Sequence, residues 1–208
     1  VPLPLPNVIT HQMSHDTIFV SIPAYRDTET IPTILSLFEN ASNSERIFIG
    51  VVFQFDSTSQ VEYDMYFNLE ALPTNLRQQH VRTIILDYRD ATGPCYARFL
   101  AQSLHRGEEY VLQIDSHMRF GPNWDSYLIG ALIRCESPQK SVLTAYPPPY
   151  YLPNDIPNET RASLLVPWKF DENGLLRQKG RLLIPLENDS YDESNIPCLL
   201  FAGGFNFS

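Results

Sequence analysis

The feature that most constrains the fold is a regular alternation of short apolar runs with segments of helical periodicity. The apolar runs are typical of buried strands and cover residues 17–22, 46–55, 81–86, 110–114 and 141–145. Helical patterns lie between them, at residues 31–40, 60–78, 94–106 and 124–135. Such an alternation indicates βαβ units, so we predict an α/β fold with a Rossmann-like core over residues 16–145. Its sheet should be mostly parallel, with helices on both faces.

The segments on either side of this core break the alternation. Residues 1–15 contain three prolines in a polar setting and are expected to form an extended lead. Residues 146–196 include the run Pro147-Pro148-Pro149, followed by two short strand patterns near 164–170 and 175–184. We interpret 146–196 as an insertion or lid over the strand ends, within a single domain that covers residues 16–208.

Composition excludes several classes of protein. The net charge is −9 and the isoelectric point is near 4.9, which disfavours nucleic acid and anionic membrane surfaces as partners. No apolar run reaches the roughly 18 residues of a membrane span, so no membrane span is predicted in this chain. The three cysteines include no C-x-x-C pair, which argues against a disulfide scaffold or a cysteine-based zinc module.

Two compositional signals point to different compartments. Sparse cysteine favours a reducing, cytoplasmic environment. Four N-x-S/T sequons favour the lumen of the secretory pathway, such as the Golgi; they are Asn40, Asn158, Asn188 and Asn206. Both compartments therefore stay open.

The end of the fourth predicted strand carries the most distinctive chemistry. Asp115 and His117 are two residues apart in an extended segment, so their side chains should point the same way. A carboxylate and an imidazole suit a divalent cation such as Mn²⁺ that also binds diphosphate oxygens. Taken alone, the pair is equally compatible with a turn or a helix cap. The chain has no G-x-G-x-x-G or P-loop motif, which disfavours those two modes of phosphate binding.

Four motifs in this order bring a family resemblance into view: TIFVSIPAYRD, DYRDATGPCYARFLAQSL, YVLQIDSHMRFGPNWD and LFAGGFNFS. Together they resemble the GlcNAc-type glycosyltransferase family, over roughly residues 16–208. Members of this family include enzymes that place α-linked GlcNAc on hydroxyproline or threonine of proteins. The chain is more distantly similar to the polypeptide GalNAc-transferases, which share an Asp-x-His metal motif. Both likenesses imply the GT-A fold, which binds a nucleoside diphosphate sugar.

The resemblance also implies roles for individual residues. Asp115 and His117 would bind the metal and act in catalysis. The nucleotide-sugar site would be built from residues after the first strand, from the start of the 94–106 helix and from a late glycine pair. These residues are Pro23, Ala24, Tyr25, Asp27, Arg89, Gly93, Pro94, Arg98, Gly203 and Gly204. Trp124 lies on the apolar stripe of its helix and is expected to be core packing.

The implied function is metal-assisted transfer of GlcNAc from UDP-GlcNAc to a hydroxyl of a protein acceptor, with retention of configuration. The hydroxyl would belong to hydroxyproline, Thr or Ser, and the cation would be Mn²⁺, with Mg²⁺ as the alternative. Two other interpretations stay open. The chain could be a non-catalytic UDP-sugar-binding pseudoenzyme, or a protein-interaction module that uses the Pro/Tyr segment 146–153.

The resemblance stops at Ser208, where the family continues with an acidic segment and a later histidine. It therefore implies a C-terminally truncated GT-A domain, with a further metal ligand and the acceptor-side residues lying beyond Ser208. On this interpretation the final strand, within GGFNFS, would form an open apolar edge, and residues 1–208 alone would bind UDP weakly and transfer little sugar.

Overall fold

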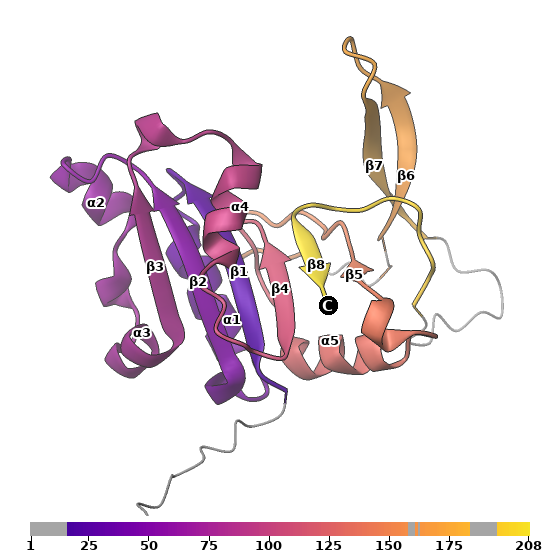
Figure 1. The fold of residues 1–208 in the computed structure, drawn as a ribbon, viewed down its shortest axis with the longest axis horizontal. Coiled ribbons are helices and arrows are strands. Elements are labelled where there is room, and N and C mark those ends of the chain that lie inside the picture. The colour runs from indigo at the N-terminus through magenta and orange to yellow at the C-terminus, as the bar shows by residue number, and fades with distance from the viewer. Residues whose placement is uncertain (1–15, 158–160, 162, 184–194) are drawn as a thin grey trace, which may run out of the picture.

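The computed structural model describes residues 16–157, 161, 163–183 and 195–208 (Figure 1). The predicted lead at 1–15 and the sequons at Asn158 and Asn188 lie outside these residues. The strands are β1 Ile18–Tyr25, β2 Ile47–Gln54, β3 Val81–Leu86, β4 Tyr110–Ile114, β5 Leu143–Thr144, β6 Ser163–Phe170, β7 Leu176–Leu182 and β8 Phe205–Phe207. The α-helices are α1 Thr30–Glu39, α2 Gln60–Tyr66, α3 Thr74–His80, α4 Pro94–Gln102 and α5 Trp124–Ile133. No helix in the described parts of the chain is long and apolar enough to cross a membrane.

Six of the strands form one sheet in the order β3-β2-β1-β4-β8-β5. β1 lies near its middle and pairs in parallel with β2 and β4, while β3 pairs in parallel with β2. β8 runs antiparallel to both β4 and β5. This mostly parallel sheet, covered by helices on both faces, confirms the predicted GT-A fold class.

Helices cover the two faces of the sheet through different side chains. On one face, α1 and α5 bury the main core, in which Ile34, Leu37 and Leu128 pack against β1 and β2. On the other face α4 packs closely against β1 and β2. Gly50 permits this approach, because a Cβ there would stand 2.5 Å from the Phe19 ring and 3.0 Å from the carbonyl oxygen of Ala101. Trp124 is buried in the core, as predicted, and its Nε1 donates to the carbonyl oxygen of Leu37 at 2.8 Å.

The first strand was predicted over residues 17–22, ending before Pro23; this end is wrong, because β1 continues to Tyr25. The backbone N–H of Arg26 donates to Gln54 on β2. Since N–H groups alternate in direction along a strand, the nitrogen of Pro23 faces away from β2, towards the β4 side. The β1–β4 pairing has already ended at Ser21. The missing N–H of proline therefore costs no ladder hydrogen bond at this position.

The prediction of an open edge at the final strand is also wrong. β8 lies between β4 and β5, and Phe207 is fully buried. Asn206, the acceptor residue of one sequon, is buried in the same strand, so the folded chain has no room for a glycan there. Its side-chain amide atoms lack hydrogen-bond partners among the described residues.

Several predicted elements are shorter than expected. The predicted 60–78 helix is divided into α2 and α3 by a 3₁₀ turn at Leu69–Ala71 and by Pro73. The predicted 94–106 helix ends at Gln102, ahead of Gly107, which adopts a φ of +95°. The predicted strand at 141–145 is reduced to the two residues of β5.

The 146–196 segment contains the two strands that were expected in it, paired as the β6–β7 hairpin. In Figure 1 this hairpin projects from the body beside β5 and β8 and does not lie across the ends of β1 to β3. The lid role predicted for this segment stays a prediction.

A buried carboxylate joins α5 to the loop between α1 and β2. Asp125 is fully buried and accepts the backbone N–H of Ser42 at 2.7 Å and that of Asn43 at 3.1 Å. The Arg46 guanidinium donates to the same carboxylate at 2.7 and 3.0 Å. These contacts fix the start of α5, and with it the segment that follows β4.

We expect Asp125→Ala to destabilise the fold by about 3 kcal/mol, because it removes the buried carboxylate that pairs with the Arg46 guanidinium and accepts two backbone N–H groups. Glu39→Ala, at an exposed carboxylate on α1, is the matched control and should change stability by less than about 0.5 kcal/mol. Urea unfolding of both variants measures the difference. Equal unfolding free energies for the two variants would contradict the role assigned to Asp125.

Candidate active site

The candidate site lies where β1, β2, β3 and β4 end, at the carboxyl edge of the sheet. This is where ligands bind in open α/β sheets. Two groups of polar side chains occur there. One surrounds Asp27, Asp115 and His117, at the ends of β1 and β4. The other surrounds Arg26, Asp56 and Arg89, at the ends of β1, β2 and β3.

Asp27 and His117 are joined directly, although they are 90 residues apart in sequence. His117 Nδ1 donates to Asp27 Oδ2 at 2.7 Å, and Ser116 Oγ donates to the same oxygen at 2.6 Å. The backbone N–H of Glu29 donates to Asp27 Oδ1 at 2.9 Å. Because the carboxylate only accepts, Nδ1 carries the imidazole proton and Nε2 is left for another partner.

These contacts shift the pKa values of both side chains. Burial pushes the pKa of Asp27 upwards, but hydrogen bonds from His117, Ser116 and the Glu29 N–H outweigh it and lower the pKa to about 2. The hydrogen bond to Asp27 raises the pKa of His117 above 6.5, against an opposing effect of burial, and the negative charge of Asp115 adds to the rise.

Asp115 is the first residue after β4 and lies against β8 and α4. Its carboxylate accepts a hydrogen bond from Arg98 Nη2 at 3.3 Å, and its backbone N–H donates to the carbonyl oxygen of Gly204 at 3.1 Å. A Cβ on Gly204 would stand only 2.3 Å from Asp115 Oδ2. Glycine at position 204 therefore makes room for the carboxylate.

Arg98 projects from α4 towards the end of β4, where it contacts Asp115. Its side chain is 23% exposed, and its Nε is buried without a hydrogen-bond partner among the described residues. A buried donor without a partner indicates a missing acceptor, such as a ligand oxygen or a water molecule. Gly203 lies beside the same guanidinium, because a Cβ there would stand 3.1 Å from Nη1.

The second group is built on ion pairs. Arg26 forms a hydrogen-bonded ion pair with Glu62 and stacks on the Tyr88 ring, 4.7 Å from its centroid. Arg89 donates to both carboxylate oxygens of Asp87 at 2.7 Å, which lowers the pKa of Asp87 to about 2. Arg89 also lies 3.8 Å from Asp56. The Arg89 side chain is 59% exposed, so it remains accessible to a ligand.

The other predicted nucleotide-binding residues lie along the same edge without direct contacts to these two groups. The last three residues of β1 are Pro23, which is partly buried, Ala24, which is buried, and Tyr25, which is 53% exposed. Gly93 and Pro94 are exposed at the start of α4, and Gly93 adopts a φ of +105°. The carboxyl edge thus gathers every predicted site residue, and each of the two groups is held together by its own hydrogen bonds and ion pairs.

Arg119 forms a connection that the sequence did not reveal. Its side chain, only 7% exposed, forms an ion pair with Glu29 and donates to Asn154 Oδ1 at 2.6 Å and to the carbonyl oxygen of Pro153 at 2.9 Å. The guanidinium also lies over the Tyr150 ring, 4.5 Å from its centroid. Part of the Pro/Tyr segment is therefore bound within the chain, next to the loop that carries Asp27.

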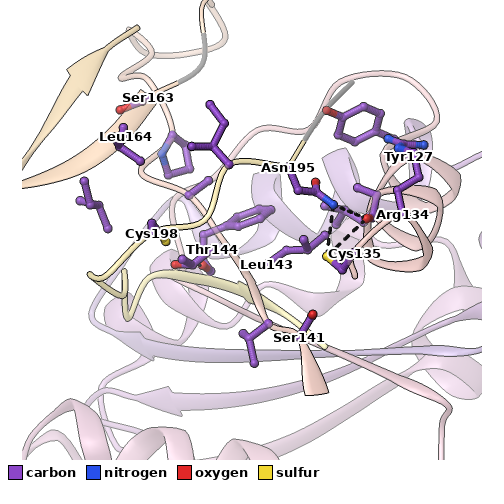
Figure 2. A pocket seen from close by; sticks show the side chains of 18 of the residues that line it. Tyr127, Arg134, Cys135, Ser141, Leu143, Thr144, Ser163, Leu164, Asn195 and Cys198 are labelled. Atoms are coloured by element: carbon purple, nitrogen blue, oxygen red, sulfur yellow. Dashed lines mark hydrogen bonds between the residues drawn. The ribbon is translucent and has the colours of Figure 1, made fainter. Parts of the chain in front are cut away.

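A cavity of about 1330 Å³ lies between α5, β5, β6 and residues 195–198 (Figure 2). Leu143, Thr144 and Cys198 are among its lining residues, and Asn195 donates to the carbonyl oxygen of Ala131 at 2.6 Å. Met118 and Arg119 bring it next to the end of β4. None of the predicted site residues lines it, so the candidate site is the open carboxyl edge.

The side chains of Asp115 and His117 are of the types that bind divalent cations, although they provide only two protein ligands. A metal-binding histidine usually donates its other ring N–H to a carboxylate, as His117 does to Asp27. Asp115 offers a carboxylate that is 43% exposed. Within the described ranges, no three or more His, Cys, Asp or Glu residues are grouped so as to hold a metal ion. Asp115 and His117 are thus the residues that would hold it.

The sequence pointed to Asp27 and His117 separately and missed the contact between them. It also missed Ser116, Glu29 and Arg119. No local signal could have revealed these contacts, because each of them joins the end of β1 to the end of β4, about 90 residues away.

The description Glycosyltransferase (GlcNAc) belongs to a family model that matches residues 17–67 and 60–208 of this chain. The chain belongs to this family. The matched residues include Asp27, Arg98, Asp115, His117 and the glycine pair, so the glycosyltransferase family model covers the whole carboxyl edge.

Similarity to individual proteins is weaker. A search of curated proteins found no match. Residues 1–349 of S. aureus TarS, solved with UDP-GlcNAc, are 19% identical at a TM-score of 0.45, covering 68% of this chain and 37% of that one. A Pyrobaculum calidifontis mannosyltransferase, PcManGT, solved with GDP-Man and Mn²⁺, is 12% identical at a TM-score of 0.45, covering 65% of this chain and 37% of its own. This chain thus spans well under half the length of each of these two solved glycosyltransferase structures.

We expect the pKa of His117, measured by NMR titration of its imidazole, to lie above 6.5 and to fall in Asp27→Asn. The stabilisation that depends on the imidazolium charge is then fully present below pH 6.5 and is lost as the pH rises through the raised pKa, while the neutral imidazole still donates its Nδ1 proton to Asp27. Asp64→Asn, an exposed carboxylate on α2, is the control and should leave the titration unchanged. A His117 pKa that is the same in Asp27→Asn would show that the contact does not form in solution.

Proposed function

We propose that this chain binds UDP-GlcNAc at its carboxyl edge and transfers GlcNAc to a protein hydroxyl, with retention of configuration and with help from a divalent cation. The hydroxyl would belong to hydroxyproline, Thr or Ser. The observation that carries the proposal is the convergence of Asp115, His117, Arg98 and the Gly203-Gly204 pair at the junction of β1, β4 and β8. Membership of the glycosyltransferase family supports the reaction class.

The donor would be held by groups of complementary chemistry. Arg98 offers a planar fork of donors, one of them buried and unpartnered, to an anionic diphosphate oxygen or to a carbonyl oxygen. Gly203 and Gly204 let the backbone approach the sugar closely. Tyr25, Arg89 and Gly93 lie along the path that the uridine would take over the ends of β1 and β3.

The cation would be Mn²⁺, with Mg²⁺ as the alternative, held by Asp115 and by Nε2 of His117. When bound, it would neutralise charge on the UDP leaving group as a Lewis acid. Asp27 would hold His117 in the tautomer that presents Nε2, and Arg98 would share the diphosphate charge. The acceptor hydroxyl would attack the anomeric carbon and pass its proton to the departing diphosphate on the same face, so that no protein nucleophile is required.

A donor-binding pseudoenzyme is the second candidate, and one observation favours it. The Asp115 carboxylate, one of the two candidate metal ligands, is already paired with Arg98. Such a protein would bind UDP-GlcNAc without cleaving it. Release of UDP from UDP-GlcNAc, measured with an acceptor protein present, separates the two candidates.

We expect a panel of UDP-GlcNAc, UDP-GalNAc, UDP-Glc and UDP-Gal to show tightest binding of UDP-GlcNAc, and only with Mn²⁺. Asp115→Asn should lower the Mn²⁺-dependent affinity about 100-fold, by analogy with the roughly 3 kcal/mol cost of losing one electrostatic partner at an active site. Asp90→Asn, at an exposed carboxylate on the same edge, is the matched control. Calorimetry measures both variants, and undiminished Mn²⁺-dependent binding in Asp115→Asn would remove Asp115 from the site.

We expect Gly204→Ala to reduce Mn²⁺-dependent UDP affinity by about tenfold while the protein stays folded, because the new methyl group would push the Asp115 carboxylate aside. Gly121→Ala is the control, since a Cβ there meets nothing within 4 Å. Calorimetry with UDP and a melting curve on each variant provide the measurement. A loss of affinity of the same size in both variants would contradict the steric argument.

A further inference from the structure

The β6–β7 hairpin differs in charge from the rest of the molecule. Between Ser163 and Leu182 it carries four cationic residues and only two acidic ones, Asp171 and Glu172, in a chain whose net charge is −9. The four cationic residues are Lys169, Arg177, Lys179 and Arg181. Together with Trp168 they form what we call the cationic face.

The strand register places the cationic residues on one side of the hairpin. Arg177, Lys179 and Arg181 alternate along β7, so their side chains share a face, and Lys169 lies opposite Arg177 in the ladder. Trp168 lies at a bulge in β6, and two ammonium groups lie close to its ring. The Nζ of Lys169 lies 4.5 Å from the ring centroid and that of Lys179 lies 6.0 Å from it. The Trp168 side chain is 56% exposed.

The opposite side of the hairpin contacts the rest of the chain. Leu165 is buried on that side, and Gln178 donates to the carbonyl oxygen of Phe201 at 3.0 Å. Gly180 lies against Tyr146, because a Cβ there would stand 3.3 Å from the ring. One side of the hairpin thus packs on the rest of the chain. Because the hairpin projects from the body (Figure 1) and all residues of β7 are exposed, the cationic face is accessible to solvent.

Most of the positive charge on this face is uncompensated. Arg177 pairs with Asp171 at 2.6 Å, and backbone N–H donors together with this pair lower the pKa of Asp171. In the parts of the chain that the structure describes, no carboxylate forms an ion pair with Lys169, Lys179 or Arg181. Lys169 and Lys179 are held beside one exposed aromatic ring and Arg181 shares their face, so these like charges repel one another, and an anionic partner would relieve that repulsion.

We propose that the cationic face binds a short acidic segment of a protein partner, with its carboxylates on Lys169, Lys179 and Arg181 and an apolar side chain on Trp168. The seven residues of β7 span roughly 23 Å, which suits a segment of similar length. A long polyanion such as nucleic acid would extend onto the acidic body and be repelled. The inference goes beyond the proposed function, since this binding needs no sugar donor.

The test measures the anisotropy of a fluorescein-labelled decapeptide of alternating Glu and Asp, titrated with the full chain. The hairpin variant is Lys169→Gln/Lys179→Gln/Arg181→Gln. The control variant, Arg77→Gln/Arg106→Gln/Lys140→Gln, removes the same charge from other elements. We expect the hairpin variant to lose at least about tenfold in affinity, since exposed pairs contribute up to roughly a factor of five each, and the control to change by less than about twofold.

Trp168→Ala should weaken binding of the peptide separately from charge, by about threefold, through the lost contact with the ring. Equal affinity of the hairpin and control variants would overturn the proposal, as would tighter binding of single-stranded DNA of matched charge. Melting curves of each variant verify folding. Mn²⁺-dependent UDP binding, measured on the same samples, should be unchanged in the hairpin variant, which keeps this test separate from that of the proposed function.

Discussion

Backbone pairing of β1 on both of its edges is the constraint on which the rest of the structure depends. The strand pairs in parallel with β2 along its whole length and with β4 over its first four residues. That shared register brings the ends of β1 and β4 to one edge, where Asp27 meets His117. On its other edge β4 pairs with β8, and β8 places Gly204 against Asp115. The positions of the site residues thus follow from the pairing of β4 with β1 on one edge and with β8 on the other.

The site is electrostatically balanced before any ligand arrives. Asp27 orients His117, and Arg98 partly neutralises Asp115. A cation at Asp115 would compete with Arg98 for the same carboxylate, and the released guanidinium would face an anionic diphosphate. Cation and nucleotide binding would therefore reinforce each other, because each provides a partner for a charge that the other displaces.

The sequence predicted the parts of this structure that depend on local periodicity. Alternating apolar runs indicated the α/β class, and the polar residues after the strands indicated the edge that holds the site. The predictions from the sequence failed where the structure depends on pairing between segments that are distant in sequence. Pro23 was expected to end β1, but its nitrogen lies on a side without a pairing strand. The final strand was expected at an open edge, but it is inserted between β4 and β5. The Asp27–His117 contact likewise had no local signature, since it joins two ends that only the folded sheet brings together.

The antiparallel insertion of β8 has a consequence for the order of folding. The β1–β4 ladder joins segments about 90 residues apart in sequence, and β8 then joins β4 across about 90 further residues. Closing so long a loop is slow compared with forming the βαβ units. During synthesis, β1 to β4 can therefore assemble well before Phe205 emerges, and Asp115 lacks its glycine neighbours during that interval. The molecule acquires a sheet first and the complete candidate site only when its last described strand has docked.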